Sequence, residues 1–276
     1  MSTPVLETPQ GNAPGIDLAE RVRDFPRLLA PMREQILADL AMLGQIPAPS
    51  GDEELRVRYL LDKFVDSGLP EVGPDVAGNA VGILPGHCGS RTILLASHLD
   101  TVYDRTVNHN VTFSTDRIVG PGVSDNSLGA AILGVLPACL AQVGVTLDAN
   151  LVLLGSVRSL GRSNHDGLRS YLQQTTRAID CGIVVEAIQL GRANYLSVGK
   201  IRGDVVCDLR AAGQSRDVAP SALVVMHQIV HRILGIAVPS RPYTKIRLGK
   251  MHAGISYDTE PDHAELGFEV VSHCDD

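Results

Sequence analysis

The sequence contains one apolar run, Ile93-Leu94-Leu95-Ala96-Ser97-His98-Leu99-Asp100-Thr101-Val102, that carries a histidine and, two residues later, an aspartate. Residues two apart in a strand point to the same side, so His98 and Asp100 should lie together. Asp100 can then hold one ring nitrogen of His98 while the other faces a metal ion. The alternative is a histidine that caps a core strand.

The composition is that of an ordinary globular chain, with 276 residues, 44% hydrophobic and 20% charged. A net charge of -7 argues against nucleic acid or an anionic membrane as partner.

No apolar stretch approaches the roughly 20 residues of a membrane span, and residues 1–15 lack the features of a signal peptide. Five cysteines without CxxC spacing are read as buried thiols in a reducing compartment: Cys88, Cys139, Cys181, Cys207 and Cys274. We therefore expect a cytoplasmic protein.

The N-terminal part predicts a flexible tail over residues 1–16 and then helices. Apolar residues recur at spacings of three and four from Ile16 to about Gln45, with a break near Pro31. Ser50 and Glu53 have the spacing of a capping box, which predicts that the next helix starts there and runs to residues 67–68.

Short strands then alternate with helices, which predicts an α/β sheet with parallel members covered on both faces. In such sheets, ligands gather at the carboxyl ends of the strands. The expected strands are 72–77, 80–84, 91–97, 111–119, 151–155 and 183–186, and the expected helices are 128–143 and 166–176.

The pattern changes at about Lys200 to β-α-β-β, with strands over 204–209, 243–249 and 264–271 and a helix over 220–234. This order is typical of a small α+β domain with an antiparallel sheet. The predicted organisation is therefore a tail at 1–16, a large domain at 17–199 and a small domain at 200–276. Exposed sheet edges in the small domain favour a homodimer or a protein partner.

Three segments together resemble the zinc metallopeptidase and deacylase family that includes acetylornithine deacetylase, succinyl-diaminopimelate desuccinylase, aminoacylase and glutamate carboxypeptidase. They are residues 97–102, 120–126 (Gly-Pro-Gly-Val-Ser-Asp-Asn) and 183–186 (Ile-Val-Val-Glu), and residues 46–54 and 78–79 also fit. The resemblance implies a mixed, largely parallel sheet sandwiched by helices. It also implies a small α+β lid that mediates dimerisation, which looks incomplete in this chain.

The resemblance implies a site for two metal ions about 3.5–4 Å apart that share a bridging carboxylate. His98 and Glu186 would hold one ion, Asp125 would be the bridge, and Asp100 would orient His98. Read singly, Asp125 could instead be a turn or N-cap residue before the 128–143 helix, and Glu186 a carboxylate at a strand end. The joint match in order favours the metal site.

The chain departs from the family where a consecutive Glu-Glu pair should supply the general base and a ligand of the second metal. Val157 and Arg158 stand there. Valine cannot take a proton, and a protonated arginine cannot bind a cation. Our hypothesis is that the Arg158 guanidinium occupies the second-metal position and pairs with Asp125. Residues 164–166 (Asn-His-Asp) are either a substitute ligand or base, or the cap of the next helix.

The small domain shows further departures. Residues 213–217 lack the lid histidine, Asp258 replaces an asparagine, and Val271 replaces an arginine that would grip a substrate carboxylate. The family's final segment, with its last metal histidine, does not follow residue 276, so the sequence is either a fragment or a natural short form. The late histidines are read as surface residues: His252, His263 and His273.

Two hypotheses follow. The first is a catalytically impaired or repurposed family member with one zinc at most, which binds a small amino-acid-derived or peptide ligand or a protein partner. The second is an active metal-dependent hydrolase of N-acyl amino acids or peptides with a rearranged site, whose base would be Asp100, His165 or Asp166. The first is favoured because the base, the second-site glutamate and the lid residues are missing together.

Overall fold

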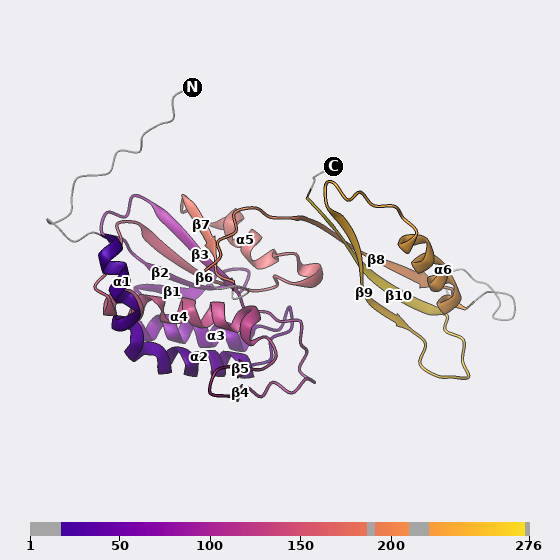
Figure 1. Ribbon diagram of the computed structural model, residues 1–276, viewed down its shortest axis with the longest axis horizontal. Coiled ribbons are helices and arrows are strands. Elements are labelled where there is room, and N and C mark those ends of the chain that lie inside the picture. The colour runs from indigo at the N-terminus through magenta and orange to yellow at the C-terminus, as the bar shows by residue number, and fades with distance from the viewer. Residues whose placement is uncertain (1–17, 187–190, 210–220, 274–276) are drawn as a thin grey trace, which may run out of the picture. The chain divides into compact units, whose positions relative to one another are not determined.

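The computed structural model describes residues 18–186, 191–209 and 221–273 (Figure 1). The chain divides into two compact units, Met1–Leu190 and Gly191–Asp276. The first unit combines a mixed sheet with helices, and the described part of the second unit is a three-stranded sheet with one helix. The predicted tail at 1–16 lies outside the described residues.

The first unit begins with helices, as predicted. α1 (Leu18–Leu29) and α2 (Arg33–Gln45) are separated by a 3-10 turn over Ala30–Met32, which confirms the break near Pro31. Proline has no backbone N–H to donate, so a tighter turn is accommodated there. The third helix, α3, covers Glu54–Asp66.

A five-stranded mixed sheet forms the centre of this unit, with the order β1-β2-β6-β3-β7. β3 runs parallel to β6 and β7, whereas β1 pairs with β2 and β2 with β6 in antiparallel fashion. The carboxyl ends of β3, β6 and β7 therefore share one edge of the sheet. The strands are β1 (Glu71–Pro74), β2 (Ala80–Leu84), β3 (Thr92–His98), β6 (Asn150–Ser156) and β7 (Cys181–Val184).

The predicted single strand over 111–119 is wrong. Two short strands, β4 (Thr112–Phe113) and β5 (Ile118–Val119), form a separate antiparallel pair. The chain reverses between them, where the N–H of Ser114 donates to the carbonyl of Arg117 at 2.8 Å.

Helices cover both faces of the central sheet (Figure 1). On one face, Leu151 and Leu153 of β6 pack with residues of α3 and of α4 (Leu128–Gln142). On the other, Val152 and Leu154 pack with Tyr171 of α5 (Asp166–Gln174). The alternation along β6 thus gives two apolar layers, as expected for a strand buried on both faces.

The segment Val123–Gln142 is long and apolar enough, by length and composition alone, to cross a membrane. The prediction that no stretch approaches this length is therefore wrong. Within this fold, 56% of the apolar window is buried in the protein, and Ala130, Ala131 and Leu133 belong to the core. This burial is typical of a core helix.

The second unit has the predicted β-α-β-β order and an antiparallel sheet, β8-β10-β9. The helix α6 packs Ala222 and Met226 against Ala264 and Leu266 of β10, and these four side chains are almost fully buried. The bounds are β8 (Gly199–Asp208), α6 (Ala222–Leu234), β9 (Thr244–Ala253) and β10 (His263–Ser272).

The cysteines are less buried than predicted. Cys88 and Cys181 are exposed, while Cys139 and Cys207 are of intermediate exposure, and Cys274 lies outside the described residues. Cys181 is exposed because it lies on β7, an edge strand whose four residues are all exposed.

A buried carboxylate joins α2 to α3. Asp39 Oδ1 lies 2.7 Å from the ammonium nitrogen of Lys63. The same oxygen accepts hydrogen bonds from the Tyr59 hydroxyl at 2.8 Å and from the Gln35 side-chain amide at 3.0 Å. Burial, together with the adjacent Asp39 carboxylate, raises the pKa of Tyr59 well above its ordinary value. The hydroxyl therefore remains a donor to Asp39.

Replacing Asp39 by alanine should lower the free energy of unfolding by about 3 kcal/mol, because it leaves a half-buried ammonium without its anion. Urea unfolding followed by circular dichroism measures this loss. The matched control is Glu54→Ala, which breaks an exposed pair with Arg58 on α3 and should cost under about 0.5 kcal/mol. Equal losses in the two variants would contradict the structural role of Asp39.

Candidate metal centre

His98 is the last residue of β3, and its side chain is only 8% exposed. Its Nδ1 lies 2.9 Å from the backbone carbonyl oxygen of Asp100, which can only accept, so Nδ1 carries a proton. The opposite nitrogen, Nε2, lies 2.9 Å from Asp125 Oδ1 and 3.6 Å from Glu186 Oε2. Two carboxylates thus meet the ring nitrogen that can donate a lone pair to a metal.

Asn126 fixes the segment that carries Asp125. Its side chain is fully buried, and its amide donates to Ser97 Oγ at 2.8 Å and to the Val185 carbonyl at 2.7 Å. One amide thereby ties the Asp125 turn to β3 and to the residue preceding Glu186. Asn126 Oδ1 also accepts the N–H of Gly129 in the first turn of α4 at 3.1 Å, so Asn126 caps the helix while the Asp125 carboxylate turns toward His98.

Gly122 is required for the approach of this segment to β3. Its φ of +66° lies in the left-handed region that side-chain-bearing residues rarely adopt. A Cβ atom there would also lie 2.6 Å from Thr101 Cγ2. The glycine of the 120–126 motif therefore allows the Asp125 turn to pack directly against the residue after Asp100.

The three side chains fit a metal ion. One potential ligand atom each from His98, Asp125 and Glu186 lies within 4.8 Å of the others. With metal–ligand bonds of about 2.0–2.2 Å, the ligand atoms around a tetrahedral zinc are separated by about 3.3 Å. The separations of 2.9 and 3.6 Å from His98 Nε2 lie on either side of that value. One imidazole and two carboxylates form a donor set suited to zinc.

The electrostatic field at this site favours a cation. Burial acts to lower the pKa of His98, but the Asp100 and Glu186 carboxylates outweigh it and raise the pKa to about 10. Because these carboxylates stabilise positive charge on the ring, they would also stabilise a metal ion beside it.

Asp100 has two roles in this geometry. Its Oδ1 lies 3.4 Å from His98 Nδ1, longer than the 2.9 Å contact of its own backbone carbonyl. Its Oδ2 accepts the Ser50 hydroxyl at 2.5 Å and the N–H groups of Ser159 and Leu160 at 2.9 and 2.8 Å. Despite full burial, which acts to raise it, the pKa of Asp100 is held below its ordinary value by His98 and these donors. The carboxylate thus contacts His98 and anchors the loop after β6.

The capping box predicted for Ser50 and Glu53 is wrong. α3 begins at Glu54 without a side-chain cap. Ser50 donates to Asp100, and the buried Glu53 accepts the N–H of Gly51 at 2.9 Å and that of Arg158 at 2.8 Å. Both side chains are used to hold distant parts of the chain rather than the helix terminus.

The loop after β6 is held rigidly although it carries no acidic pair. Val157 is only 3% exposed and belongs to the main core cluster. Its N–H donates to the buried Asn79 side chain at 2.9 Å. Arg158 Nε donates to Asp166 Oδ2 at 2.8 Å, so the hypothesis that Arg158 pairs with Asp125 is wrong. The cause is the loop geometry, since Arg158 with a φ of +50° is directed to the start of α5.

The structure therefore brings together four of the predicted site residues, His98, Asp100, Asp125 and Glu186. Of residues 164–166, Asp166 opens α5 and pairs with Arg158, while His165 is the residue before the helix. Among the described residues, the cluster of potential metal ligands comprises His98, Asp125 and Glu186, without His165 or Asp166.

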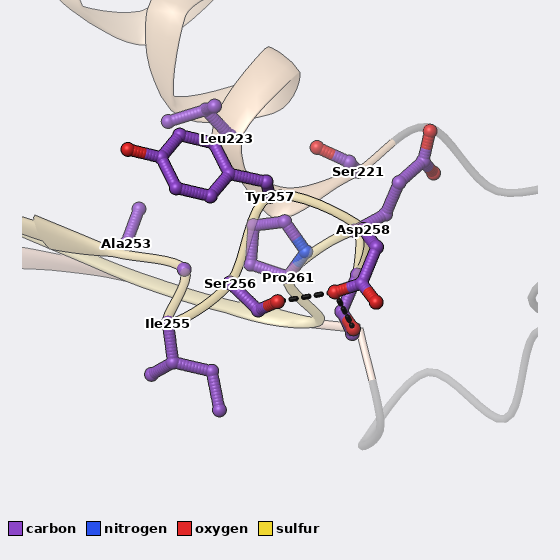
Figure 2. A pocket seen from close by; sticks show the side chains of 11 residues that line it. Ser221, Leu223, Ala253, Ile255, Ser256, Tyr257, Asp258 and Pro261 are labelled. Atoms are coloured by element: carbon purple, nitrogen blue, oxygen red, sulfur yellow. Dashed lines mark hydrogen bonds between the residues drawn. The ribbon is translucent and has the colours of Figure 1, made fainter.

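In the second unit, Val271 is buried on β10, and Asp258 lies in the β9–β10 connection, where it accepts a hydrogen bond from Ser256 (Figure 2). This connection lines a pocket of about 720 Å³. Tyr257 lies beside Leu223, and the Ile255 side chain points away from the Tyr257 ring.

His252 is exposed, as predicted, while His263 lies within 3.7 Å of the Asp208 and Glu265 carboxylates. Residues 213–217 lie outside the described residues.

Sequence reasoning missed the structural role of several polar residues that support the site. Ser50 and Glu53 matched a local helix signal and Asn79 matched a turn signal, while the sequence analysis did not single out Arg56. Full burial of Arg56 and Asn79 is seen only in the folded chain. The one usable signal was Asn126, which directly follows the Asp125 motif residue.

Comparison with known proteins agrees with this geometry. The chain is 26% identical over 239 residues to carboxypeptidase G2 of Pseudomonas sp. (strain RS-16), covering 80% of this chain and 56% of that protein. Human carnosine dipeptidase 1 has a TM-score of 0.67 at 11% identity, over 92% of this chain and 73% of that one. The Bacillus subtilis YXEP protein, a dinuclear metal-binding peptidase of the M20 family, has a TM-score of 0.54 at 11% identity, over 89% and 66%. No protein-family model matches the chain.

The chain has a mixed α/β fold similar to that of these peptidases, and the His98 cluster is one possible metal site. The similarity to carboxypeptidase G2 and the shared fold support the resemblance to the zinc peptidase and aminoacylase family that its motifs show. The chain spans little more than half the length of the curated relative it matches.

Proposed function

We propose that this chain is a single-zinc member of the family in which hydrolysis is impaired. The observation that carries the proposal is the side-chain content of the loop after β6. A buried valine and an arginine paired with Asp166 occupy positions 157 and 158. Neither side chain can deprotonate water or ligate a second metal ion.

His98, Asp125 and Glu186 would hold the ion. Zinc with three protein ligands can polarise a carbonyl or activate water when bound. The chain's own contribution is to hold the ring of His98 through the Asp100 carbonyl and to fix the Asp125 turn through Asn126. Of the carboxylates considered as a base, Asp166 is engaged by Arg158, and Asp100 is engaged by Ser50 and by the loop after β6.

The proposed ligand is a small amino-acid-derived or peptide molecule whose carbonyl or carboxylate reaches the zinc. An oxygen of such a ligand supplies the kind of donor that completes a three-ligand zinc site. The names of the homologous peptidases support this class of ligand.

The test is zinc analysis together with hydrolysis assays on dipeptides and N-acyl amino acids. We expect about one zinc per chain, as for a site with three protein ligands, and no turnover above the metal-free control. A second zinc per chain with turnover would contradict the proposal and favour the alternative, an active hydrolase with a rearranged site. Absence of zinc binding would also contradict it.

We also propose a homodimer, or a complex with another protein, through the second unit. Beside the edge strand β9, the exposed apolar residues Leu223, Val224 and Met251 line a hollow of about 390 Å³. Exposed apolar surface next to a strand edge supports association. Light scattering of the purified chain measures the oligomeric state.

A cytoplasmic location stays a prediction, which cell fractionation would test.

A further inference from the structure

Arg56 is the one arginine or lysine among the buried residues that the structure describes, and its exposure is 0%. It lies on α3 and reaches away from the helix into the interior of the first unit. A fully buried guanidinium is costly to desolvate unless an anion and hydrogen-bond acceptors compensate for it. Its surroundings therefore indicate what it does.

The guanidinium joins two segments that frame the metal site. Its Nε donates to the carbonyl of Ile46 at 2.9 Å and its Nη1 to the carbonyl of Leu99 at 3.0 Å. Leu99 lies between His98 and Asp100. The N–H of Thr101 donates to the carbonyl of Ala48 at 2.7 Å, so the segment that begins at Ile46 is also fastened to the end of β3.

The compensating anion is Asp100, which is itself fully buried. Arg56 Nη2 and Asp100 Oδ1 both lack a hydrogen-bond partner among the described atoms, while the two groups attract each other electrostatically. Burial lowers the pKa of Arg56 to about 10, and Asp100 opposes this shift. With such a pKa, Arg56 remains a cation at neutral pH.

We propose that Arg56 is a positioning residue of the metal site, whose buried positive charge keeps the Asp100 carboxylate in place against His98 and the loop at 159–160. This inference rests on the proposed zinc site. Asp100 contacts the ring that would ligate the metal, so the charge of Arg56 affects the zinc affinity indirectly, through Asp100 and His98. Changes to residues behind metal ligands typically cost about 10–100-fold in metal affinity.

The experiment compares Arg56→Gln with Arg56→Lys. Glutamine retains an amide donor for the two carbonyls but loses the charge, whereas lysine retains the charge. Zinc affinity, measured by competition with a chromogenic chelator on the full chain, should fall about tenfold or more in R56Q and stay within about threefold in R56K. In the Asp100→Asn background, R56Q should cause no further loss, because the two residues act as a unit.

The stability control is Asp39→Ala, which removes a buried ionic contact on α2, outside the metal cluster, and should leave zinc affinity unchanged. Equal zinc affinity in wild type and R56Q would overturn the inference while leaving the proposed function intact. Additive losses with Asp100→Asn would overturn it as well. If R56Q fails to fold, R56K decides, since a loss beyond about tenfold with the charge retained excludes a charge-based role. A wild-type chain that binds no zinc would overturn both proposals.

Discussion

Replacing His98 by alanine should abolish zinc binding. The variant loses one of three potential ligands, and the one that is most buried. The loss of zinc affinity should therefore exceed the roughly 10–100-fold reduction that follows when a residue hydrogen-bonded to a metal ligand is replaced. Metal content after dialysis against zinc-containing buffer should fall from about one equivalent to background.

Thermal unfolding gives an independent readout of the same change. Zinc at about 100 times its Kd should stabilise the wild-type chain by about 2.7 kcal/mol, and the His98→Ala variant should gain nothing. The matched control is His252→Ala, an exposed histidine on β9 that should leave both readouts unchanged. Zinc retained by His98→Ala at wild-type affinity would place the metal elsewhere and refute the site.

Replacing Val157 by glutamate should destabilise the fold rather than restore an enzyme. The valine side chain belongs to the core cluster that includes Leu60 and Leu153, so a glutamate there would be an unpaired buried charge. The expected loss is about 3 kcal/mol or more. For a chain of this size it corresponds to a decrease in Tm of roughly 6–12 °C, measurable by calorimetry.

The neighbouring substitution Arg158→Glu is the matched control, since it introduces the same carboxylate at a partly exposed position. It breaks the pair with Asp166, whose side chain is 56% exposed, and should cost no more than about 1 kcal/mol. Zinc content should remain at one equivalent in both variants. A stable Val157→Glu chain that binds a second zinc and hydrolyses peptides would show that the loop retains an intact second site, against the proposed impairment.

The sequence predicted the parts of this protein that depend on local patterns and chain order. The apolar run ending at His98 is β3, and the α/β alternation produced the two-faced sheet. The resemblance of the motifs to the metallopeptidase family implied that His98, Asp125 and Glu186 would converge, and one potential ligand atom of each lies within 4.8 Å of the others. Their role as ligands stays a prediction for the metal analysis to test.

The parts that sequence could not predict depend on long-range polar contacts. Ser50 satisfied a helix-capping pattern, yet in the fold its hydroxyl donates to Asp100, 50 residues away. Arg158 looked free to pair with Asp125, but Glu53 fixes its backbone and Asp166 takes its guanidinium. A local pattern contains no information about which distant acceptor becomes available after folding.

The loop after β6 owes its shape to residues that lie elsewhere in the chain. Asn79 holds the backbone of Val157, Glu53 that of Arg158, and Asp100 that of Ser159. The loop's own side chains take no part in these three backbone contacts. At the partly exposed position 158, mutation can therefore exchange the side chain without removing these backbone contacts, so scaffold and chemistry can evolve separately there. Such independence gives a lineage a route by which catalytic side chains are lost or replaced while the fold persists.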